Sequence, residues 1–275
     1  MNRNTRASAV RHLAMLLLAC VVLAPVAASG ANLPHAYAGK GSMIEMREGK
    51  TKFSGYLSLP KGAGTHTGIV VVHEWWGLND WVKQQTDSLA SHGYVALAPD
   101  LYKGRVAYDE ETAHQLMSGL VEEEAIATLR AAADFLRSRD DVRANAIGVI
   151  GWCLGGRYAI RLAAADPGIR AAVIYYGAPI TDPAAIRGIQ AAMLGNFGAE
   201  DKGPSPEQVK QFEAALRKAG KKVDFKIYPG AGHGFANENN PWGGFRPAAA
   251  KDAWKRTLPF LDRELKRASL PGRKS

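Results

Sequence analysis

Residues 151–156 read Gly-Trp-Cys-Leu-Gly-Gly and match the G-x-S-x-G nucleophile elbow, with a cysteine in place of the serine. An apolar strand pattern precedes this motif and a helical pattern over residues 154–165 follows it, as an elbow requires. The turn is tight, so we expect side chains at the flanking glycines to clash with neighbouring elements. The cysteine stands at the amino end of the helix, where the helix dipole favours a thiolate. Cys153 is therefore the predicted nucleophile, with Leu154 offering a backbone N–H to an oxyanion; a buried structural cysteine is the alternative.

Two further groups with acid–base chemistry follow strand patterns. His233 lies in a glycine-rich loop after the predicted strand 223–228, where an imidazole can reach the elbow. Asp201, with Glu200 as the alternative, follows the preceding strand and can orient that imidazole. The chain order of nucleophile, acid and base is that of the α/β-hydrolases.

A polar pair also follows the apolar run of residues 68–72. Glu74 must find a partner there or be partly protonated, because a carboxylate is costly to bury alone. His73 is interpreted as structural, since no second histidine stands at a spacing suited to a metal. We expect no metal site and no cofactor.

The elements that must position these groups alternate along the chain. Strands are predicted at 51–59, 68–73, 94–98, 147–150, 171–176, 191–194 and 223–228. Helices are predicted at 80–92, 109–138, 154–165, 206–219 and 247–267, the last with a kink at Pro259. Such alternation predicts one α/β domain with a mostly parallel sheet covered by helices on both faces. In such sheets ligands bind at the carboxyl ends of the strands, where the polar groups above lie.

The first 31 residues are expected to be a secretory signal peptide rather than part of the fold. A basic start is followed by an apolar run and small residues, and cleavage after residue 28 or 31 would fit. A retained N-terminal anchor and a lipoprotein site at Cys20 are the alternatives. We therefore expect a periplasmic or secreted protein whose mature form has no membrane span. A flexible basic tail is expected over residues 268–275.

The composition fits a globular enzyme better than its charge suggests. The chain has 275 residues, 47% hydrophobic and 22% charged, with a mean hydropathy of -0.18, enough for one well-buried domain. Its formal charge of +9 would invite a nucleic-acid partner, but much of the excess lies at the two ends. The basic residues concerned are Arg3, Arg6, Arg11, Lys266, Arg267, Arg273 and Lys274. We therefore expect no nucleic-acid partner.

The number and spacing of the cysteines exclude two further features, an internal disulfide and a thiol redox pair. Loss of Cys20 with the signal peptide would leave Cys153 alone, so no internal disulfide is expected. The absence of a C-x-x-C pair argues against a thiol redox protein.

With these motifs in place, the sequence resembles the dienelactone hydrolase family, the cysteine branch of the α/β-hydrolases. The resemblance covers 41–267, and its specific parts are residues 73–79, 98–102, 151–156 and 232–235. It implies Cys153 as nucleophile, His233 as base and Asp201 as its orienting group. It also implies Trp75 and Leu154 as oxyanion-hole donors, and Glu74 as the acid that contacts the resting cysteine and takes its proton when substrate binds.

The sequence departs from the family where dienelactone-cleaving members carry two carboxylate-binding arginines. Four residues beyond the histidine stands Asn237, and before the long helix stand the acidic residues 109–111, with Arg105 nearby but poorly aligned. Bidentate carboxylate binding is therefore not expected, whereas ester or lactone hydrolysis is. The segment 237–247, with Trp242, is either a lid at the pocket rim or a packed loop. Residues proposed to contact substrate are Trp76, Tyr102, Trp152, Tyr176, Phe235 and Asn237.

The sequence thus predicts a monomeric hydrolase of small esters or lactones that proceeds through a thioester acyl-enzyme. The alternative is a small-molecule-binding protein that keeps the fold but has lost efficient catalysis. An apolar ligand that raises thermal stability without being consumed would indicate that alternative.

Overall fold

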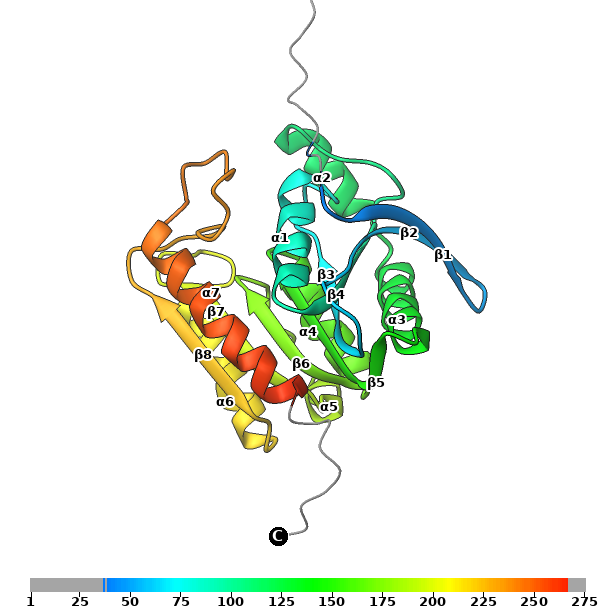
Figure 1. Cartoon of the computed structure of the whole chain (residues 1–275). Helices are drawn as coiled ribbons and strands as arrows, with labels where there is room; N and C mark the ends of the chain where they lie inside the picture. Colours follow the sequence, from blue (N-terminus) through cyan, green and yellow to red (C-terminus); the bar gives the residue numbers. More distant parts are fainter. Residues whose placement is uncertain (1–36, 38, 267–275) are drawn as a thin grey trace, which may run out of the picture. The chain divides into compact units, whose positions relative to one another are not determined.

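Eight strands form one sheet in the order β1-β2-β4-β3-β5-β6-β7-β8, in a computed structural model that describes residue 37 and residues 39–266 (Figure 1). β2 pairs antiparallel with both β1 and β4, and all other neighbours pair parallel. The strands are β1 Ser42–Glu48, β2 Thr51–Ser58, β3 His66–Val72, β4 Tyr94–Pro99, β5 Val142–Trp152, β6 Ile169–Tyr175, β7 Ala192–Gly198 and β8 Val223–Tyr228. The predicted single-domain α/β fold with a mostly parallel sheet is confirmed.

Helices cover both faces of the sheet, because successive strand residues point to opposite sides. In β3, Val70 and Val72 pack into one core with α3, α4 and α6, while Ile69 and Val71 pack into the other with α1 and α7. The helices are α1 Asp80–Ser91, α2 Glu110–Ser118, α3 Glu122–Ser138, α4 Leu154–Ala165, α5 Pro183–Gly188, α6 Pro206–Lys218 and α7 Pro247–Leu261. A π-helical turn, η1 Asp262–Lys266, follows α7.

Three elements differ from the sequence prediction. The helix predicted over 109–138 is two helices, because the chain leaves helical geometry after Gly119 and is extended at Val121. Glycine is a poor helix former, and the acids that follow favour a new helix N-terminus. Strand β1 and the short helix α5 were not predicted. The residues proposed as signal peptide and basic tail lie outside the described part of the chain.

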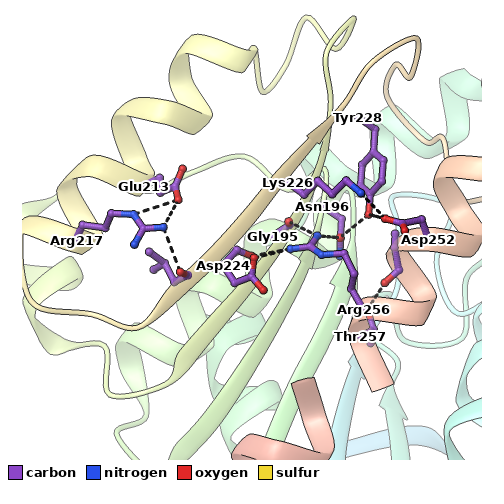
Figure 2. Close-up of polar contacts among 12 residues, drawn as sticks. Gly195, Asn196, Glu213, Arg217, Asp224, Lys226, Tyr228, Asp252, Arg256 and Thr257 are labelled. Carbon is purple, nitrogen blue, oxygen red and sulfur yellow. Dashed lines mark hydrogen bonds and ion pairs between the residues drawn. The ribbon is translucent and has the colours of Figure 1, made fainter. Parts of the chain in front are cut away.

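Helix α7 is fastened to the sheet edge formed by β7 and β8 (Figure 2). Arg256 donates to Asn196 Oδ1 on β7 and to Asp224 Oδ1 on β8, both at 2.7 Å. Asp252, one turn earlier on α7, accepts a 2.9 Å hydrogen bond from the Tyr228 hydroxyl at the end of β8. These bonds hold α7 against β7 and β8, the two strands from which two site loops depart. Among the described residues, no helix is both long and apolar enough to cross a membrane.

Candidate active site

Cys153 occupies a sharp turn between β5 and α4 and has a backbone conformation that L-residues rarely adopt. Its φ is 54° and its ψ is -117°, while its N–H donates to the carbonyl of Tyr175 at 3.0 Å. A side chain at Gly151 would overlap the backbone of Gly155, and one at Gly155 would overlap the Val72 carbonyl. The predicted need for glycine on both sides of the cysteine is thereby confirmed. Such strain at the tip of a strand-to-helix turn is typical of a nucleophile held ready for attack.

The loops after β7 and β8 bring an acid and a base together. His233 Nδ1 donates to Asp201 Oδ2 at 2.9 Å, and the other carboxylate oxygen accepts the Gly203 N–H at 2.8 Å. Asp201 is buried whereas Glu200 is exposed, so the structure pairs the imidazole with Asp201. With Nδ1 committed to the carboxylate, Nε2 is left for the thiol of Cys153, which also hydrogen-bonds the imidazole.

The ionisation of His233 reflects these neighbours. Burial alone would lower its pKa, but the hydrogen bonds with Asp201 and Cys153 and their charges raise it to about 10. A high pKa keeps the imidazole protonated beside the cysteine at neutral pH. A cation beside the sulfur is the arrangement that activates a cysteine nucleophile.

Glu74 lies buried at the end of β3 and has two hydrogen-bond donors. Asn237 Nδ2 donates to Oε2 at 2.6 Å, and the Tyr176 hydroxyl donates to Oε1 at 3.4 Å. Burial raises the pKa of Glu74 to about 7, although the bond from Asn237 and the charge of His233 oppose that rise. Glu74 is thus hydrogen-bonded to Asn237 and Tyr176. The hydrogen-bond partner of the Cys153 thiol is the imidazole of His233.

Both residues of the predicted oxyanion hole lie close to Cys153 in the fold. Leu154 is the first residue of α4, so its N–H has no acceptor within the helix. Trp75 lines the same pocket as Cys153, in the loop that follows β3. The positions of both residues suit the role of oxyanion donors.

The pocket over the thiol is small and closed by aromatic side chains. Its lining residues are Glu74, Trp75, Trp76, Cys153, His233, Gly234, Asn237, Asn240 and Trp242. Its volume of about 10 Å³ has room for about one water molecule. Trp242 lies 5.6 Å from the Trp75 ring and 6.0 Å from the Trp76 ring, and its indole N–H donates to Glu110 of α2. The segment 237–247 therefore both packs against these rings and roofs the pocket.

Of the six proposed substrate contacts, Trp76 and Asn237 line this pocket. Trp152 packs between Trp81 and Tyr175 in the core, and Phe235 is fully buried. These two rings are placed as core residues, not as lining residues.

The other two proposed contacts lie beside the pocket. Tyr176 is fully buried, and its hydroxyl donates a hydrogen bond to Glu74. Tyr102 packs on His73, with a separation of 4.8 Å between the ring centroids. Tyr102 also borders a larger cavity of about 590 Å³ between the β1–β2 hairpin, the loop after β4 and the start of α3. That cavity contains none of Cys153, Asp201 and His233.

Sequence reasoning missed Asn240. Its side-chain amide donates to the carbonyls of His233 and Gly234, both at 3.3 Å, and so supports the loop that carries the base. The available sequence signal was the glycine at position 234 followed by an asparagine-rich stretch, which is typical of turns. No group of three or more metal-binding side chains occurs within the described residues.

Comparison with known proteins identifies the family of this chain. The profile of the "Dienelactone hydrolase family" matches residues 53–265. "Protein usf" of Aquifex pyrophilus is 32% identical over 80% of this chain and 97% of its own length. A "Putative carboxymethylenebutenolidase" of Aquifex aeolicus is 30% identical over 82% of this chain and all of its own length. The crystal structure of a "Putative Dienelactone Hydrolase" from Klebsiella pneumoniae superposes with a TM-score of 0.74 at 26% identity, covering 81% of this chain and 98% of that one. The chain belongs to the dienelactone hydrolase family of α/β-hydrolases.

Proposed function

We propose that this protein hydrolyses small, uncharged carboxylic esters or lactones through a thioester acyl-enzyme on Cys153, with His233 as base and Asp201 as its orienting group. The observation that carries the proposal is the continuous contact from the thiol of Cys153 through the imidazole of His233 to the buried Asp201 carboxylate, 2.9 Å away. A nucleophile, a base and an orienting group in this relation are what acyl transfer needs.

Acylation begins when the Cys153 thiolate attacks the ester carbonyl carbon. A C–S bond forms, and the carbonyl electron pair moves to oxygen, where the N–H groups of Trp75 and Leu154 stabilise the oxyanion. Collapse of this intermediate breaks the C–O bond, and the departing alkoxide takes a proton from the His233 imidazolium. The alcohol leaves, or stays tethered to the acyl group if the substrate is a lactone.

Deacylation returns the site to its starting state. Neutral His233 takes a proton from water while the oxygen of that water attacks the thioester carbonyl. The second tetrahedral intermediate expels the Cys153 thiolate and releases the carboxylic acid. The imidazolium and the thiolate are thereby restored.

The preference for uncharged substrates follows from the pocket lining. It contains the acid Glu74 and no lysine or arginine. A carboxylate on the substrate would find no lysine or arginine to pair with, because the His233 imidazolium is already paired with Asp201, and it would be repelled whenever Glu74 is ionised. The rings of Trp75, Trp76 and Trp242 also line the pocket and favour apolar acyl or alcohol groups.

The test is a panel of esters and lactones on the purified protein, with intact-mass detection of an acyl adduct after acid quench. Dimethyl succinate and monomethyl succinate form a matched pair that differs by one carboxylate. We expect turnover, an adduct located on Cys153, and a higher kcat/KM for the diester. A panel with no turnover, together with a ligand that raises Tm without being consumed, would instead identify a binding protein.

Ionisation of Glu74 should control the lower limb of the pH profile. We expect kcat/KM to rise with a midpoint at about pH 7, the pKa to which burial raises Glu74. Below that pH Glu74 is neutral and gives no charge to support the imidazolium; above it the carboxylate does. Glu74→Gln should remove this limb and lower the rate at pH 8 roughly tenfold, the effect of about 1.4 kcal/mol.

A second variant, Asn237→Ala, tests the direction in which the midpoint of the pH profile moves. Asn237→Ala removes a hydrogen bond that favours the carboxylate, so the midpoint should move above 7. An unchanged midpoint in Glu74→Gln would assign the ionisation to another group.

Truncating Trp242 should open the pocket. We expect Trp242→Ala to raise the ratio of kcat/KM for p-nitrophenyl octanoate over p-nitrophenyl acetate about tenfold, because the roof over a pocket that holds about one water is removed. Trp254→Ala, a half-buried tryptophan of α7 that contacts His92, is the matched control and should leave the ratio unchanged. Equal ratios in wild type and Trp242→Ala would show that this ring does not limit access.

A further inference from the structure

The imidazole of His73 is fully buried at the end of β3, and both of its nitrogens are hydrogen-bonded. Nδ1 lies 2.6 Å from the carbonyl oxygen of Glu74, and Nε2 lies 3.2 Å from the backbone nitrogen of Leu101. A carbonyl only accepts and an amide N–H only donates, so Nδ1 carries the proton and Nε2 does not. Burial lowers the pKa of His73, which keeps the ring in this neutral form.

The carbonyl bonded by His73 belongs to a peptide unit that faces the active site. Because a peptide is planar and trans, the Glu74 carbonyl and the Trp75 N–H point in opposite directions, and fixing one fixes the other. The same carbonyl also accepts the Gly77 N–H at 3.1 Å. Trp75 is the residue whose N–H the proposed mechanism uses as an oxyanion donor.

We propose that His73 is a positioning residue that aims the Trp75 N–H at the oxyanion through its bond to the Glu74 carbonyl. This inference rests on the proposed ester hydrolysis. Donation to the carbonyl also polarises the peptide, which strengthens its N–H as a donor. The hydrogen bond from the Leu101 N–H anchors the ring to the loop after β4. The orientation of the Trp75 N–H therefore depends on the loops after β3 and β4, not on the 73–77 loop alone.

Other roles for this imidazole fit the contacts less well. Both nitrogens are occupied, so the ring has no free lone pair for a metal or for a substrate proton. A purely architectural ring would need either bond equally, since both satisfy buried backbone groups. The positioning role, in contrast, depends on Nδ1–H specifically.

Two single substitutions separate the bonds. The amide of asparagine reaches the place of Nδ1, whereas the amide of glutamine reaches that of Nε2. We expect His73→Asn to retain kcat within about threefold and His73→Gln to lose roughly 10- to 100-fold in kcat at similar KM, less than or comparable to full loss of an oxyanion donor. Equal losses in the two variants would overturn the proposal.

Alkylation by iodoacetamide provides the second readout, because it needs the Cys153 thiolate but forms no oxyanion. We expect both variants to alkylate at the wild-type rate, and slow alkylation of His73→Gln would place the defect at the nucleophile and overturn the proposal. The imidazole nitrogen shifts of His73 in the wild-type protein test the geometry without any variant: a protonated Nε2 would also overturn it. A wild-type protein inactive on the whole ester panel would refute the proposed function, a result distinct from these.

Discussion

Replacing Cys153 with alanine is expected to lower kcat for p-nitrophenyl acetate at least ~1,000-fold, because the acyl group then has no sulfur to which it can bond. The remaining oxyanion donors should leave a small rate above that of buffer alone. Steady-state turnover and intact-mass detection of the acyl adduct measure the two consequences together. Equal rates in wild type and variant would exclude Cys153 as the nucleophile.

Cys153→Ser is the matched control for shape. It retains a side chain of similar size at a position with a φ of 54°, so neither substitution adds a new backbone strain there. A serine hydroxyl is a far weaker nucleophile than a thiolate beside an imidazolium, so activity should still fall steeply. Both variants should keep a cooperative thermal transition, which separates loss of chemistry from loss of fold.

Replacing Asp201 with asparagine is expected to lower kcat about 100- to 10,000-fold with little effect on KM. Asparagine can keep the bond from Gly203, but its amide donates to His233 Nδ1 and so forces the proton onto Nε2. An imidazole in that tautomer cannot accept a proton from the attacking water. The pH profile of kcat measures the altered base directly.

Glu200→Gln tests the neighbouring carboxylate. Glu200 is exposed and its backbone N–H, not its side chain, serves the fold by donating to Ala231 at 2.9 Å. The Glu200→Gln variant should therefore be as active as the wild-type protein. If Glu200→Gln loses activity and Asp201→Asn does not, the orienting acid has been assigned to the wrong residue.

The sheet could be predicted from local sequence because its strands are buried on both faces and read as continuous apolar runs. The break between α2 and α3 could not, since one glycine is a weak signal within a long helical pattern. Contacts distant in sequence stabilise the start of α3. Arg161 of α4 donates a hydrogen bond to the carboxylate of Glu122 at 2.7 Å. Strand β1 buries only Met46 fully, too little for the alternation to stand out.

The placement of Cys153, Asp201 and His233 could be predicted because each follows a strand whose carboxyl end faces the same edge. The choice between Asp201 and Glu200 required the structure, since adjacent residues differ only in which one turns inward. Ring burial is likewise a tertiary property. The sequence shows an aromatic residue at position 152 but not that it packs against Trp81 of α1.

The loops that carry Asp201 and His233 are joined by the backbone bond from Glu200 to Ala231, and they depart from β7 and β8, the two strands that Arg256 fastens to α7. Native proteins open in cooperative units with free energies below that of global unfolding. An opening of this edge therefore moves acid and base as one body and leaves Cys153 on its central strand. We therefore expect the amide hydrogens of these two loops to exchange earlier than those around Cys153. The expected consequence is a reversible loss of activity in mild denaturant that precedes unfolding of the rest of the sheet.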